Sequence, residues 1–140
     1  MKILFVTRDI PFPPKNGYKK RNFYLLKALV DRGNEVFLLG RNTEDVRRED
    51  ILELKKYCQR IKLLKIKEPT FAALRQLLKS LFSALPFSVI RRVLPDLRQE
   101  VAVWIKEHGI DTVICDSVYQ ALNVPRDSYE LRVTSCELRV

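Results

Sequence analysis

The chain has 140 residues, the length of about one domain, and 46% of them are hydrophobic, which argues against a disordered chain. Lysine and arginine total 26, aspartate and glutamate total 17, and the formal net charge is +9. This excess favours anionic partners such as phosphorylated ligands, nucleic acid or an anionic membrane surface. A solvated basic surface without a partner is the plainer alternative.

The cysteines and the single histidine argue against the common metal sites. Cys58, Cys115, Cys136 and His108 lie far apart and form no C-x-x-C pair, whereas a zinc site needs about four ligands. An odd number of scattered cysteines suits a reducing cytosol. We expect no signal peptide, because Lys2 leads straight into a strand-like apolar run, and no apolar run reaches the roughly 20 residues of a spanning helix. We therefore expect a cytoplasmic protein with no metal and no cofactor.

The first forty residues predict a strand, a helix and a second strand. "KILFVT" (2–7) is a continuous apolar run, typical of a strand buried on both faces of a parallel sheet. Residues 19–33 predict a helix that ends near Gly33, and "NEVFLLG" (34–40) predicts the next strand. The helix carries one apolar face, formed by Phe23, Leu26, Leu29 and Val30. This is a right-handed βαβ unit.

The same alternation continues along the rest of the chain. In order, we expect a helix from Asn42 or Thr43 to about Tyr57, a strand at 60–67 near a sheet edge, a helix at 70–85, a helix beginning at Pro95, a strand at 110–115 and a turn and strand within 124–135. The pattern predicts an α/β fold, a Rossmann-like doubly wound parallel sheet. We expect one domain over 1–140 that forms the front part of a longer protein, because the chain stops after a strand.

The segment "RDIPFPPKNGYKKR" (8–21) is the leading candidate for a binding loop. It follows the first strand, and doubly wound sheets bind ligands at the carboxyl ends of their strands. Its prolines stiffen it, and Gly17 permits a backbone conformation closed to other residues. A helix begins directly afterwards, with Lys15, Lys19, Lys20 and Arg21 beside its positive end. We therefore expect a phosphate or another anion here, although the loop is neither a G-x-G-x-x-G fingerprint nor a Walker A loop.

Each candidate residue has a plainer alternative, and none can be assigned as catalytic. Lys15, Asn16 and Gly17 either contact a ligand or shape a turn, and Arg21 either points into a cleft or lies on the surface. Asp116 follows a strand end, where it either binds substrate or, with Ser117, caps a helix. We expect His108 and Trp104 to be packing residues, and we consider weak acceptor contacts by Ser135 and Glu137 conceivable.

The opening "MKILFVTRDIPFPPKNGYKKRNFYLLKALVDRGNEVFLL" resembles the amino-terminal start of retaining GT-B glycosyltransferases of the large group 1, or family 4, type. Pro13, Pro14 and Gly17 match the family's P-P-x-x-G-G loop, with Tyr18 in place of the second glycine. Arg21 matches an arginine of the family's first helix. The other matching segments are "LLKAL" (25–29), "GNEVFLL" (33–39), "LPFSVIRR" (85–92) and "IDTVICDSVY" (110–119), where Cys115 stands in place of a frequent histidine.

The resemblance implies an acceptor-side half of a two-domain enzyme. In such enzymes a second domain, absent from this sequence, binds most of the nucleotide-sugar donor. The implied substrate-binding residues are Lys15, Asn16, Gly17, Arg21 and Asp116. The acceptor would be a sugar, a polysaccharide or a lipid-linked molecule, and the isolated chain would be inactive. One alternative is a non-catalytic subunit of a split glycosyltransferase, which recruits a donor-binding chain. A basic nucleic-acid-binding module is a remote alternative, and we expect no nucleic-acid partner because the sequence lacks interleaved aromatic residues on a strand face and a helix-turn-helix pattern.

Residues 71–94 raise the question of a membrane contact. The segment is rich in large apolar residues and carries Arg75, Lys79, Arg91 and Arg92 with no acidic residue. We expect the stripe of Leu74, Leu78 and Leu81 to pack on the sheet. The remaining apolar side chains could then lie peripherally on an anionic membrane surface, which suggests a cytoplasmic protein at the inner face of the membrane.

Overall fold

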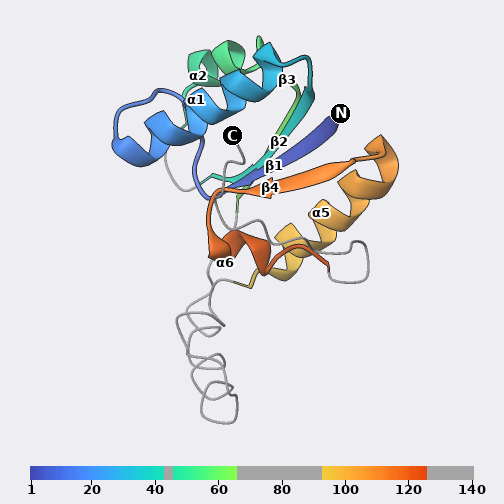
Figure 1. The fold of residues 1–140 in the computed structure, drawn as a ribbon. Helices are drawn as coiled ribbons and strands as arrows, with labels where there is room; N and C mark the ends of the chain where they lie inside the picture. The colour runs from blue at the N-terminus through green and yellow to red at the C-terminus, as the bar shows by residue number, and fades with distance from the viewer. Residues whose placement is uncertain (43–45, 66–92, 126–140) are drawn as a thin grey trace, which may run out of the picture.

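The computed structural model describes residues 1–42, 46–65 and 93–125 (Figure 1). The elements of this part of the chain are β1 (Lys2–Thr7), α1 (Gly17–Asp31), β2 (Glu35–Arg41), α2 (Arg48–Leu54), β3 (Cys58–Leu64), α5 (Pro95–His108), β4 (Thr112–Cys115) and α6 (Val118–Ala121). The helix expected at 70–85 lies outside the described residues. So do the membrane contact expected from 71–94, apart from its last two residues, and nearly all of the strand expected within 124–135.

The strands form a parallel sheet in the order β3-β2-β1-β4 among the described residues. The chain therefore moves outward from β1 through β2 to β3 and then crosses to the other side of β1. This reversal leaves a topological switch point between the carboxyl ends of β1 and β4, the place where ligands bind in open α/β sheets. The predicted Rossmann-like, doubly wound fold is confirmed.

Helices cover both faces of the sheet, with α1 and α2 on one face and α5 on the other (Figure 1). Successive strand residues point to opposite faces, so Phe5 and Leu38 pack toward α1 and α2 while Val6 and Leu39 pack toward α5. Both faces of β1 and β2 are therefore buried, which explains why these strands are continuous apolar runs.

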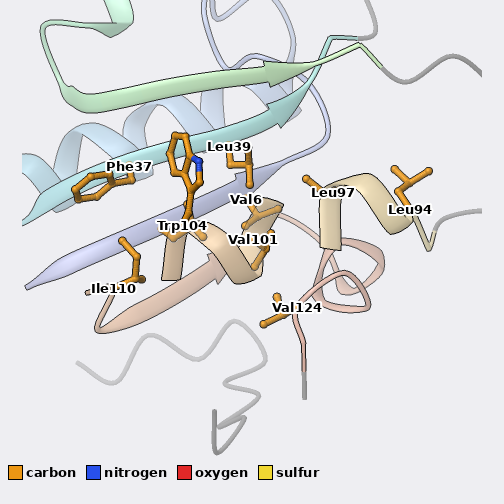
Figure 2. Packing of buried hydrophobic residues seen from close by; sticks show 10 residues of the cluster. Val6, Phe37, Leu39, Leu94, Leu97, Val101, Trp104, Ile110 and Val124 are labelled. Carbon is orange, nitrogen blue, oxygen red and sulfur yellow. The ribbon is translucent and has the colours of Figure 1, made fainter. Parts of the chain in front are cut away.

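The α5 side of the core is built from residues at helical spacing (Figure 2). Leu97, Val101 and Trp104 are each at most 5% exposed and pack on the sheet. Pro95 begins the helix as predicted, and Gly109 ends it with a φ of 61°. The ring of His108 stacks on Phe37, with centroids 5.1 Å apart and an interplanar angle of 15°. This contact confirms the packing role expected for His108.

The helix after β2 is shorter than the sequence suggests. It begins at Arg48 rather than near Asn42, and it ends at Leu54. The backbone N–H of Asn42 instead donates to the carbonyl oxygen of Leu64 at 2.9 Å, which continues the pairing of β2 with β3. One of the two residues expected to cap the helix, Asn42, therefore pairs with β3 instead, and the other, Thr43, lies outside the described residues. The edge position predicted for β3 is confirmed for the described sheet.

Candidate functional site: the Asp116 cluster

Asp116 lies directly after β4, at the switch point, and its residue is 8% exposed. Its Oδ2 atom accepts hydrogen bonds from the Thr7 hydroxyl and from the backbone N–H of Arg8, both at 2.8 Å. The hydroxyl of Tyr18, in the first turn of α1, donates to the same oxygen. One carboxylate oxygen therefore joins the ends of β1 and β4 to the start of α1.

Arg21 adds a contact to the backbone of the same residue. Its Nη2 atom donates to the carbonyl oxygen of Asp116 at 2.9 Å. Tyr18 and Arg21 are three residues apart and share one face of α1. We call Thr7, Arg8, Tyr18, Arg21 and Asp116 the Asp116 cluster. It fixes the start of α1 and the beginning of the preceding loop against the end of β4.

Burial raises the pKa of Asp116 above its ordinary value, because the charged carboxylate loses contact with water. Four weaker influences lower the pKa of Asp116 without cancelling the effect of burial. They are the hydrogen bonds from the Arg8 N–H and the Thr7 hydroxyl, the nearby Ser117 hydroxyl, and the charge of Arg8. The Oδ1 atom is buried and has no hydrogen-bond partner. A carboxyl group with a raised pKa at a switch point is a recognised mark of functional sites.

The rest of the loop packs against α1. The guanidinium of Arg8 pairs with the carboxylate of Asp9 at 2.9 Å, and its Cζ atom lies 5.3 Å from the centre of the Tyr18 ring. The ring of Phe12 lies against that of Phe23, with centroids 5.5 Å apart. The Asp9 carboxylate therefore balances the positive charge of Arg8 within the loop, and the Phe12–Phe23 contact attaches the loop to α1.

Gly17 does not have the special conformation that glycine permits. It is the first residue of α1 and is not among the described glycines with positive φ, which are Gly33 and Gly109. A Cβ atom at Gly17 would meet no heavy atom within 4 Å. The conformational freedom of Gly17 is therefore not used, and the helix begins after the Asn16 cap. Asn16 is extended, and its Oδ1 accepts the backbone N–H of Lys19 at 2.8 Å as the helix cap.

The predicted site residues separate into two groups. Arg21 and Asp116 meet in the cluster, whereas Lys15, Asn16 and Gly17 are exposed where the loop enters α1. The expected helix cap does not explain Asp116: Ser117 occupies the cap position of α6 and makes no side-chain capping hydrogen bond. Asp116 instead accepts hydrogen bonds at its carboxylate from Thr7, Arg8 and Tyr18, and at its backbone carbonyl from Arg21. Lys15 and Lys20 remain exposed cations at the start of α1.

Thr7 and Tyr18 were not predicted from the sequence as members of this site. Thr7 is the polar last residue of an otherwise apolar strand, which is the kind of position that often faces a site. Tyr18 stands three residues before Arg21, on the same face of the helix, but nothing in the sequence indicates that this face meets the end of β4.

Other parts of the described chain are weaker candidates for a functional site than the Asp116 cluster. An open hollow between β3 and α5 is lined by Arg60, Lys62, Glu100, Trp104 and Glu107, and it contains no member of the Asp116 cluster. Burial raises the pKa of the Cys58 and Cys115 thiols to about 12, so neither is a ready nucleophile. Within the described ranges we find no group of three or more His, Cys, Asp or Glu residues placed to hold a metal ion. No helix in those ranges is both long and apolar enough to cross a membrane.

Comparison of the chain with protein-family models, with curated protein sequences and with solved structures gives no match in any of the three searches.

Proposed function

We propose that this chain is the acceptor-side domain of a glycosyltransferase, which moves a sugar from a nucleotide-sugar donor to a sugar or lipid-linked acceptor. The observation that carries the proposal is the meeting of β1, β4 and α1 at Asp116. Ligands of doubly wound sheets bind at this switch point. The class of enzyme comes from the resemblance of the first forty residues to GT-B enzymes.

The charges around the start of α1 support this proposal. Lys15, Lys20 and Arg21 are exposed residues beside a helix N-terminus, where backbone N–H groups add partial positive charge. Such a surface suits the diphosphate that develops charge when a sugar leaves its nucleotide. A GT-B active site lies between two domains, so a second domain, on this chain or on a partner, would hold most of the donor.

The test is made in the cell that produces the protein, so that any partner is present. The gene is altered to encode Asp116→Asn, and membranes and cell extract are supplied with labelled nucleotide sugars. We expect sugar transfer to fall by about tenfold or more, because a substitution in the reaction site removes transition-state stabilisation. Immunoblotting checks that the protein is present in equal amount.

Asp96→Asn is the matched control, because Asp96 is an exposed aspartate in the first turn of α5. It should leave transfer unchanged. Equal transfer by the parent and Asp116→Asn proteins, for every donor sugar supplied, would refute the proposal. The purified chain should neither transfer nor hydrolyse nucleotide sugars by itself, and turnover by that preparation would contradict the proposed need for a second domain.

A further inference from the structure

Several buried side-chain atoms of the described residues have no hydrogen-bond partner, and the residues that carry them follow strand ends or lie in helices α1 and α6. Asp116 follows β4, Gln120 lies in α6 just beyond it, and Asn42 follows β2. Each leaves one side-chain oxygen unpaired, and Asn22 of α1 leaves both its oxygen and its nitrogen unpaired. Native proteins contain few such groups, and each calls for an explanation such as a function or a bound molecule.

Asn22 belongs with the Asp116 cluster by its position on the helix. Tyr18 and Arg21 both contact Asp116, and Asn22 is four residues after Tyr18, on the same face of α1. Asn22 is 1% exposed. The helix face that meets the end of β4 therefore includes a buried amide group with no partner.

The chemistry of these atoms selects the ligand. The unpaired atoms of Asn22, Asp116 and Gln120, on the elements around the switch point, comprise three oxygens and one nitrogen. Oxygens of this kind accept hydrogen bonds, so the complementary ligand must bring donors. A phosphate or diphosphate group brings acceptors and negative charge, and it would be repelled by the carboxylate of Asp116. Hydroxyl groups of a neutral polyol donate and accept at once.

The rim of this region offers an apolar surface. Val118 is 81% exposed and Tyr119 is 38% exposed, and both follow Asp116 within three residues. A sugar ring combines hydroxyl groups with apolar C–H faces, and binding sites for small molecules commonly join apolar surface to a few convergent polar groups.

We propose that the switch point binds a neutral polyhydroxylated ligand, whose hydroxyls donate to Asp116 Oδ1 and pair with the Asn22 amide. The inference rests on the proposed function in one respect, because it makes this ligand the acceptor sugar. It also divides the site: hydroxyls bind at the end of β4, and anions bind at the exposed lysines of the α1 start.

The ligand needs an opening to reach these atoms, because the unpaired oxygens are sealed from solvent in this arrangement. In this proposal the opening forms where the side chains of Tyr18 and Arg21 join α1 to Asp116. Binding therefore separates the start of α1 from the end of β4. New hydrogen bonds to Asp116 and Asn22 offset the contacts that are released.

The experiment measures binding rather than turnover, on the full chain labelled with ¹⁵N. Amide shifts are followed while glucose, mannose, N-acetylglucosamine, glycerol, inorganic phosphate and pyrophosphate are added separately. We expect one or more of the sugars to bind with a Kd of about 1–10 mM, the weak affinity of a small ligand with few contacts. The shifts should centre on Arg8, Tyr18, Asn22 and Asp116.

Asn22→Leu is the deciding variant, since leucine has the same number and branching of side-chain atoms as asparagine. It should lower sugar affinity by about tenfold while raising the melting temperature, because an unpaired buried amide is removed. Gln99→Leu, at an exposed amide of α5, is the control and should leave affinity unchanged. Unchanged sugar affinity in Asn22→Leu would overturn the proposal, as would a purely structural loss in which melting temperature and affinity fall together.

The outcomes also separate this inference from the proposed function. Sugar binding that depends on Asn22, without sugar transfer in cells, supports the site and refutes the transferase. Transfer in cells together with no sugar binding by the chain, or with phosphate alone shifting the Asp116 cluster, refutes the neutral polyol site and leaves the transferase standing.

Discussion

At the scale of single residues, Asp116 shows how burial and hydrogen bonding compete for one carboxyl group. Its Oδ2 atom receives the donors of the cluster, whereas its Oδ1 atom is buried without any. A fully satisfied carboxylate would have a lowered pKa, but burial dominates here and the pKa is raised. The folded protein therefore binds the Asp116 proton more tightly than the unfolded chain does.

This raised pKa predicts the sign of a pH effect on stability. Where the native state binds more protons than the unfolded state, the free energy of unfolding falls as pH rises. For Asp116 the fall should extend from the ordinary aspartate pKa, about 3.9, up to the raised native value. Asp116→Asn lacks this titration, so the stability of the parent protein relative to the variant should decline across that window and stay level above it.

Urea unfolding of both proteins, at intervals from about pH 3.5 to pH 8, measures this difference. Comparing the two proteins at each pH removes the titration of all the other carboxyl groups. A relative stability that rises with pH would contradict the prediction, because it would mean that the hydrogen bonds to Oδ2 outweigh the burial.

At the scale of elements, the site depends on how closely β1 and β2 approach each other. Thr7 of β1 is paired with Gly40 of β2, and a Cβ atom at Gly40 would lie 3.0 Å from Cγ2 of Thr7 and 3.3 Å from its carbonyl oxygen. Gly40 therefore makes room for the threonine whose hydroxyl bonds to Asp116. Gly17, in contrast, has open space around its Cα atom.

The two glycines give a matched pair of alanine substitutions. Gly40→Ala should destabilise the protein by about 1–3 kcal/mol, because Thr7 and Leu63 must move to accept the methyl group. Gly17→Ala should be neutral or stabilise by up to about 1 kcal/mol, because alanine restricts the unfolded chain and fits the helix. Chemical denaturation measures both, and equal effects of the two substitutions would contradict the local packing described for Gly40.

At the scale of the whole molecule, the order β3-β2-β1-β4 divides the sheet into inner and outer strands. Among the described residues, β1 pairs with β2 and β4, and β2 pairs with β1 and β3. These inner strands also carry the side chains that both helix layers cover, including Phe5, Leu38 and Leu39, each 0% exposed. In the same part of the chain β3 pairs with β2 alone, and it alternates exposed with half-buried residues over most of its length.

This arrangement predicts the pattern of amide hydrogen exchange. The amides of β1 and β2 should exchange only through global unfolding, since both strands lie in the centre of the core. The average rate for β3 should be about tenfold faster or more, because local opening exposes an outer strand without unfolding the rest. Exchange followed by NMR tests this, and average protection in β3 equal to that in β1 would contradict it.

Strand and helix identities follow from local physics, and the sequence determined them. Two patterns in the sequence indicate which residues are buried. One is the continuous apolar run of β1 and of β2, and the other is the helical spacing of Leu97, Val101 and Trp104. Burial on both faces of β1 already required helices on both sides of a parallel sheet. Arg21 was predicted as a site residue because it matches a family motif, and Asp116 was predicted because it follows the end of a strand.

Only the tertiary structure decided which residues meet, because contacts between distant segments depend on the order of the strands. Thr7 and Asp116 are far apart in the sequence, and their hydrogen bond exists because β4 pairs with β1 rather than with β3. The face of α1 that carries Tyr18 lies against the end of β4 for the same reason. Asn42 was one of two residues expected to cap a helix, but long-range pairing with Leu64 decided its role. Periodicity and composition report how much of a residue is buried, and they do not report its partner.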